Sequence, residues 1–179
     1  SKKYAVIIID PPPPFTAAGT TVLYSEEFYR DLTRKLYTGG IVSQWIFFDS
    51  RIDDIAMATK SFVNVFPYIK VYRSPDNRYG FFLEGSFSPF VADATLEKVK
   101  LANQGANRNF AEHYSTYTLS DINKWLIGDR DRLIKWLGST LSVSDDRPRT
   151  EYFLLRHLFS TSSDTKGKSA TEVLESPVN

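Results

Sequence analysis

Apolar residues form a short run over 4–9, and the run ends at Asp10. A run of this length and composition predicts a strand that is covered on both faces, as in a parallel sheet. Four prolines follow Asp10, and because proline has no backbone N–H, the strand cannot continue past this carboxylate. In open α/β folds, ligands bind just beyond the carboxyl ends of the strands. Asp10 therefore occupies a position typical of a catalytic acid or base.

The next segments change between helical and strand patterns. Ser25 can cap a helix that two glutamates begin, and the apolar spacing predicts that this helix ends at Gly39-Gly40. The apolar segment 41–48 predicts a second strand, and Ser50 predicts the cap of a second helix, which ends before Pro67. A strand, a helix and a strand with short connections predict a right-handed βαβ unit.

The hydrophobic and polar pattern of the remaining chain predicts a hairpin and then short helices. Segments 68–73 and 79–84 read as strands around a polar turn, and we expect an antiparallel hairpin at one edge of the sheet. The later patterns predict short helices over 95–103, 120–127, 129–137 and 150–159.

Composition narrows the function classes. The 179 residues are enough for one domain with an appendage, and the 22 basic and 21 acidic side chains nearly cancel. This balance argues against nucleic acid or an anionic membrane surface as a partner. The absence of cysteine excludes disulfides, thiolate metal sites and cysteine nucleophiles. No run approaches the ~20 apolar residues of a membrane span, and no signal peptide is recognisable, so we expect a cytoplasmic protein.

Several stretches together resemble the second half of the spermidine synthase family, which consists of aminopropyltransferases on the methyltransferase-type Rossmann fold. They are Asp10 with its small-residue loop, residues 23–29, and residues 39–44. The resemblance runs over 4–83 and is greatest to a divergent bacterial group, which residues 145–152 also resemble. Some members of that group carry a transmembrane segment upstream.

The resemblance implies a fold class and a domain organisation. We expect an α/β fold, a partial Rossmann-like sheet that lacks its first strands, with an antiparallel terminal hairpin and a C-terminal helical extension. Residues 1–90 would be the C-terminal half of the Rossmann domain, 91–159 the helical extension and 160–179 a polar tail.

The resemblance also implies site residues. Asp10 matches the base that deprotonates the attacking amine, Tyr24 and Gln44 match positions near the polyamine, and Pro11 falls at the cofactor. Each position has a simpler interpretation. Asp10 can merely accept amide hydrogen bonds in the loop, Gln44 can be a satisfied buried amide, and Tyr24 can be an ordinary core aromatic.

Two departures from the family pattern matter. The family carries a second aspartate that helps to hold the amine, and here Pro13 takes its place. The strands that carry the cofactor-binding glycine turn are absent, so the 179 residues read as part of a longer parent protein. We therefore expect no cofactor in this chain, with decarboxylated S-adenosylmethionine or S-adenosylmethionine implied for the parent.

Three functions stay open on the sequence. The parent transfers an aminopropyl group to a polyamine, it transfers a methyl group, or the chain is a non-catalytic interaction and assembly module. The carboxylates Asp145, Asp146 and Glu151 could suggest a metal site. Arg147 and Arg149 lie between them, so an ion-pair turn is favoured instead. The opening strand would leave a bare apolar edge, which predicts a homodimer, cover by the C-terminal helices, or pairing with the missing N-terminal half.

Overall fold

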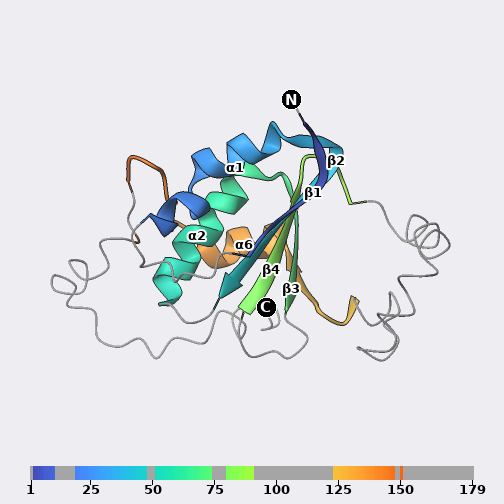
Figure 1. Ribbon diagram of the computed structural model, residues 1–179. Helices are drawn as coiled ribbons and strands as arrows, with labels where there is room; N and C mark the ends of the chain where they lie inside the picture. Colours follow the sequence, from blue (N-terminus) through green and yellow to red (C-terminus); the bar gives the residue numbers. More distant parts are fainter. Residues whose placement is uncertain are drawn as a thin grey trace, which may run out of the picture.

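A computed structural model describes residues 2–10, 19–47, 51–73, 80–90, 123–147 and 150 (Figure 1). Within these residues, five strands form one open sheet in the order β1-β2-β4-β3-β5. The strands are β1 (Tyr4–Ile9), β2 (Leu36–Phe47), β3 (Tyr68–Arg73), β4 (Gly80–Ser86) and β5 (Leu126–Asp129). The helices are the 3-10 helix η1 (Thr20–Tyr24), α1 (Glu26–Thr33), α2 (Ile52–Val65) and α6 (Arg130–Leu137).

The topology confirms the predicted α/β class. β1 and β2 run parallel and are joined through η1 and α1, with Ile9 opposite Gln44. β3 and β4 form the predicted antiparallel hairpin, and β4 lies antiparallel to β2 as well. The chain thus inserts β4 between β2 and β3, which run in the same direction. The hairpin was expected at the sheet edge, and this is wrong, because β5 pairs with the outer side of β3.

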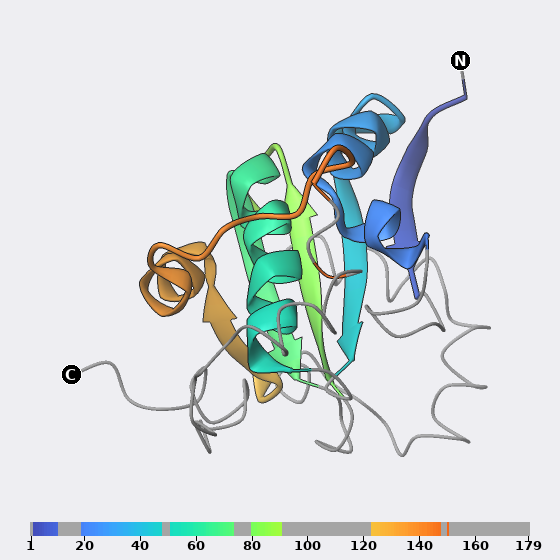
Figure 2. The ribbon, with the colours of Figure 1, turned by 90° about the vertical axis from the view of Figure 1, so that its left-hand side faces the viewer.

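All the described helices lie on one face of the sheet (Figures 1 and 2). Alternate strand residues point into this face and pack against α1, α2 and α6. We call it the helix face, and the opposite one the far face. The hydrophobic core lies on the helix face, and its prominent members are Tyr29, Val42, Ile46, Phe62, Phe66, Val71, Phe81, Leu83 and Leu133.

The opening strand was expected to be covered on both faces, and the described residues do not bear this out. Ile9 is buried on the helix face, whereas Val6 and Ile8 point to the far face and are exposed. No described helix lies there. The apolar run therefore correctly predicted a strand but not the cover on its second side.

The predicted end of the first helix is also wrong. α1 ends at Thr33, and Gly39-Gly40 lies inside β2. Gly39 adopts a φ of 77°, and a Cβ on Gly40 would come within 2.9 Å of the Tyr37 carbonyl oxygen. The glycines thus serve an irregularity in the strand, where the β1–β2 register shifts, rather than a helix terminus.

The caps show where local chemistry was a reliable guide. Ser25 Oγ accepts from the Phe28 amide at 3.2 Å, and Asp129 Oδ1 accepts from the Arg132 amide at 3.0 Å. Both predicted helix starts are thereby confirmed. The N-cap of α2 is Arg51, without a side-chain cap, rather than the predicted Ser50, which lies outside the described residues.

The segment predicted as a helix over 120–127 contains the start of β5. Leu126 pairs with Tyr72 of β3 and Gly128 with Val71, so pairing with a distant strand prevails over the local helical pattern. Leu133 and Leu137 of α6 join the same core. The described part of the predicted extension thus belongs to the sheet and core of the first unit. The boundaries at 90 and 159 stay predictions, and segments 95–103, 151–159 and 160–179 lie outside the described residues.

Candidate functional site

The predicted base, Asp10, lies at the carboxyl end of β1 and is exposed to solvent. Its neighbour Ile9 pairs with Gln44 of β2, so Asp10 and Gln44 lie at the same level of the parallel strand pair. The structure therefore brings these two predicted residues to one region of the sheet. Pro11, the predicted cofactor contact, lies outside the described residues.

Tyr24, the last residue of η1, completes this region. Its side chain is buried, and burial raises the pKa of the phenol, with a further contribution from the negative charge of Asp10. Because a carboxylate nearby disfavours a second negative charge, Tyr24 stays protonated and can donate a hydrogen bond. The structure thus places Tyr24 within the electrostatic reach of Asp10.

Tyr29 of α1 extends the group toward Gln44. Its hydroxyl donates to Gln44 Oε1 at 3.1 Å, and Gln44 Nε2 donates to the Trp45 carbonyl oxygen at 2.9 Å. Both side chains are fully buried, and burial together with Tyr24 raises the pKa of Tyr29. This is the environment of a satisfied buried amide. A substrate contact by Gln44 stays a prediction.

Local sequence explains how the two tyrosines are positioned. Ser25 lies between η1 and α1, and its Oγ donates to the Val22 carbonyl at 2.9 Å while accepting from Phe28. One hydroxyl thus ends η1 and starts α1, which sets the geometry of Tyr24 relative to Tyr29. Sequence reasoning identified the cap and Tyr24. It missed Tyr29, whose signal is its place within the 23–29 motif.

A late residue also reaches this region. The hydroxyls of Thr21 in η1 and Thr150 share a hydrogen bond of 2.9 Å, and both residues are buried. Residues 145–152 contributed to the family resemblance, and Thr150 belongs to them. The segment 145–147 forms the predicted turn, in which the Arg147 amide donates to the Ser144 carbonyl at 3.0 Å.

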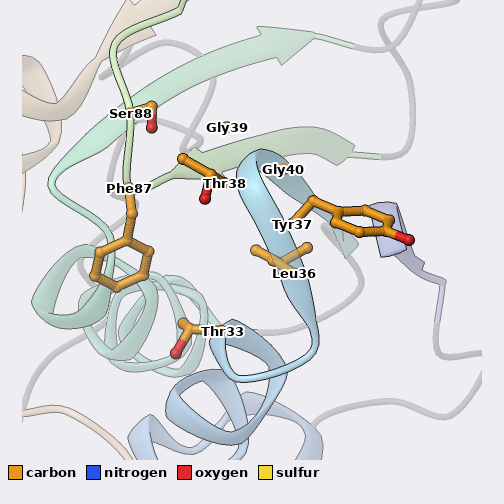
Figure 3. A pocket seen from close by; sticks show the side chains of 8 residues that line it. All are labelled: Thr33, Leu36, Tyr37, Thr38, Gly39, Gly40, Phe87 and Ser88. Atoms are coloured by element: carbon orange, nitrogen blue, oxygen red, sulfur yellow. The ribbon is translucent and has the colours of Figure 1, made fainter. Parts of the chain in front are cut away.

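A pocket of about 400 Å³ lies elsewhere, at the amino end of β2 (Figure 3). This end of the strand pair is opposite to Asp10. Among the described residues, its lining carries no charged side chain and offers hydroxyl, backbone, aliphatic and aromatic contacts. The lining residues are Thr33, Leu36, Tyr37, Thr38, Gly39, Gly40, Phe87 and Ser88.

On the far face, sequence reasoning missed a half-buried carboxylate. Ser43 Oγ donates to Glu84 Oε1 at 2.8 Å across the β2–β4 pair. Burial raises the pKa of Glu84, and the hydrogen bond from Ser43 opposes this only in part. The pKa of Tyr72 is raised by burial and by the charge of Glu84. The available signal was a single acidic residue within an otherwise uncharged strand.

The part of the chain that the structure describes has neither a cluster of metal-ligating side chains nor a membrane-spanning helix. There, no group of three or more His, Cys, Asp or Glu side chains could hold a metal ion. No helix in the same ranges is long and apolar enough to cross a membrane.

Comparisons with known proteins add a likeness to solved structures. No model of a known protein family matches the chain. A search of the curated proteins finds no match either. Among solved structures, the chain is similar to a probable spermidine synthase from Corynebacterium glutamicum ATCC 13032, with 19% identity and a TM-score of 0.49. The match covers 81% of this chain and 50% of that one, so the chain spans about half the length of the solved structure.

Proposed function

We propose that the chain is the C-terminal part of a spermidine synthase-like transferase, which moves an aminopropyl group from decarboxylated S-adenosylmethionine to a polyamine. The observation that supports this most is the grouping of Asp10 and Tyr24 at the carboxyl end of β1. There the negative charge of the solvent-exposed Asp10 adds to the effect of burial and raises the pKa of the Tyr24 phenol. The motif resemblance over 4–83 supplies the reaction class.

The chemistry requires a base at this place. A polyamine nitrogen is protonated near pH 7 and has no lone pair until a base removes its proton. In the proposed reaction, Asp10 takes that proton, the amine forms a C–N bond to the aminopropyl carbon, and the C–S bond to the donor sulfur breaks. Burial and the negative charge of Asp10 raise the pKa of Tyr24, so in the proposed site Tyr24 stays protonated and can serve as a hydrogen-bond donor.

The isolated chain is proposed to be inactive, because no glycine-rich cofactor turn follows a strand in its sequence. The test therefore uses the full-length parent, incubated with a diamine and each donor, with mass spectrometry of the product. Addition of an aminopropyl group supports the proposal, whereas addition of a methyl group shows the methyltransferase alternative.

An Asp10→Asn variant of the parent tests the proposed base. We expect kcat/KM to fall by about 10²–10⁴-fold, as for other general bases, with little change in Tm, because Asp10 is exposed. Asp53→Asn, at an exposed carboxylate on α2, serves as the control and should keep full activity. Equal activity of Asp10→Asn and the parent would exclude Asp10 as the base.

A second candidate is a non-catalytic assembly module. It is favoured by Gln44, whose amide is fully buried and engaged with Tyr29 and Trp45, and by Pro13 in place of the second family aspartate. No product with either donor, under conditions where the parent binds the cofactor, would support this function and overturn both transferase proposals.

A further inference from the structure

The segment that follows α6 crosses the helix face and contacts both longer helices there. We call residues 138–147 together with Thr150 the strap. Figure 2 shows it passing across α2 and reaching α1. Val143, in the middle of the strap, is fully buried, and its amide donates to Ser61 Oγ of α2 at 2.8 Å. The strap is therefore packed into the molecule by both apolar and polar contacts.

The strap holds the start of α1 through two hydrogen bonds. The Glu26 amide belongs to the first turn of the helix, where backbone amides have no partner within the helix. It donates to the Val143 carbonyl oxygen at 3.1 Å. In the opposite direction, the Asp145 amide donates to Glu27 Oε2 at 3.1 Å. The strap thus fixes the first two residues of α1, which come directly after Ser25 and close to Tyr24.

The end of the strap holds η1 on the other side of Tyr24. The hydroxyls of Thr21 and Thr150 share a hydrogen bond of 2.9 Å, and both residues are buried. η1 has five residues, and its N-cap Gly19 makes no side-chain cap. A 3-10 helix of this length has little stability of its own, so contacts with other segments decide where it lies. Tyr24 is therefore held between strap contacts that precede and follow it in the chain.

We propose that Thr150 is a positioning residue of the candidate site, which fixes η1 through Thr21 and thereby sets the place of Tyr24 at the carboxyl end of β1. The inference rests on the proposed function, in which Tyr24 is a hydrogen-bond donor near the reacting amine. It makes the strap a part of the site, although Thr150 lies 129 positions after Thr21. If the hydrogen bond served stability alone, its loss would lower Tm and leave the turnover of the folded enzyme unchanged.

Turnover by the full-length parent distinguishes the two roles. Thr150→Val removes the hydroxyl with little change in volume, and we expect kcat to fall by about 10–100-fold while KM for the aminopropyl donor is unchanged. Thr150→Ser keeps the hydroxyl and should restore most of the lost turnover. Ser86→Ala is the matched control, because its buried hydroxyl donates to the Gly40 carbonyl oxygen at 3.1 Å, at the opposite end of β2. Equal kcat for Thr150→Val and Ser86→Ala, at a temperature where both are folded, would overturn the proposal.

Hydrogen exchange of the same parent variants tests the positioning without relying on activity. Thr150→Val and Thr21→Val remove one hydrogen bond from its two sides, so the second variant serves if the first does not fold. In each, the Ser25 amide, which donates to the Val22 carbonyl oxygen at 3.1 Å, should exchange about tenfold faster, as expected for the loss of a buried hydrogen bond. Ser86→Ala should leave this exchange unchanged.

The two readouts separate this inference from the proposed function. Unchanged exchange of the Ser25 amide in both threonine variants would overturn the positioning role, even in a parent that transfers aminopropyl groups. Faster exchange in a parent that forms no product with either donor would support the placement of η1 by the strap and would overturn only the proposed function. Mass spectrometry of peptides that cover residues 20–28 measures the exchange.

Discussion

The two faces of the sheet are built from the same strands but differ in what covers them. On the helix face, the rings of Tyr29 and Phe62 pack edge to face with 5.1 Å between their centroids, and Phe66 packs against Phe62. On the far face, exposed Val6 and Ile8 lie on one strand, next to the polar pair of Ser43 and Glu84. An apolar strand residue is therefore not by itself a core residue. Cover from another element makes it one.

The largest effect should come from crowding the helix face at Gly85. A Cβ there would lie 2.5 Å from Phe66 Cγ and 2.6 Å from Phe62 Cζ, so Gly85→Ala must displace two buried rings. We expect a loss of about 1–3 kcal/mol or more in the free energy of unfolding, measured by urea denaturation. Gly128→Ala is the control, because its Cβ would meet the flexible Arg132 side chain at 3.2 Å. Equal costs for both would contradict the dense packing of this face.

Removing the hydroxyl of Tyr29 should have the next largest effect. Tyr29→Phe leaves Gln44 Oε1 buried without this hydrogen bond, which costs about 1–3 kcal/mol. In the double variant with Gln44→Met, the second substitution should cost less than it does alone, because no amide is then left unsatisfied. Additive losses in this double-mutant cycle would show that the two side chains are not coupled. Tyr37→Phe, at an exposed hydroxyl, should be close to neutral.

The same substitution on the two faces compares them directly. Val42→Thr places a hydroxyl in the fully buried helix face and should cost about 1–3 kcal/mol. Val6→Thr, on the far face, should change stability by less than about 0.5 kcal/mol. Thermal unfolding at low protein concentration keeps any self-association out of the measurement. A large loss from Val6→Thr under these conditions would mean that the far face is covered.

The smallest effect concerns Glu84. Its raised pKa means that the folded state favours the protonated carboxyl, so this contribution to stability is fully present below the unfolded pKa. It is lost as the pH rises through the higher folded pKa. Glu84→Gln should therefore raise Tm slightly at pH 7 and remove part of its pH dependence. Asp31→Asn, at an exposed carboxylate, should leave the Tm profile almost unchanged.

Local chemistry made several features of the fold predictable. Ser25 and Asp129 cap the helices that their sequences predicted, because a cap depends on residues within one turn. The β3–β4 hairpin followed from two apolar runs around a polar turn. Gly39-Gly40 was misread because glycine ends helices and also permits irregular strands, and only the neighbouring strand distinguishes the two. β5 was missed because its pairing partner lies more than fifty residues earlier in the chain.

In the candidate site too, some residues were predictable from the sequence and others were not. Asp10 was predictable from an apolar run followed by prolines, and Tyr24 and Gln44 from motif resemblance. The link from Tyr29 to Gln44 was not, because it joins α1 to the middle of a strand through two side chains that the sequence places fifteen residues apart. Glu84 drew no attention, because its burial depends on the neighbouring strands β2 and β3.

The sequence by itself determined the strand that ends at Asp10, the capped helix starts and the order of the main strands and helices from β1 to β4, because hydrophobic period and capping act over a few residues. Only the tertiary structure decided the position of β4 between β2 and β3, the pairing of β5, and the placement of Tyr24 within the electrostatic reach of Asp10. These features depend on contacts between distant segments, whose free energy appears only when the whole sheet has formed. The tertiary structure also decided which face of β1 is covered, since that depends on where the helices pack.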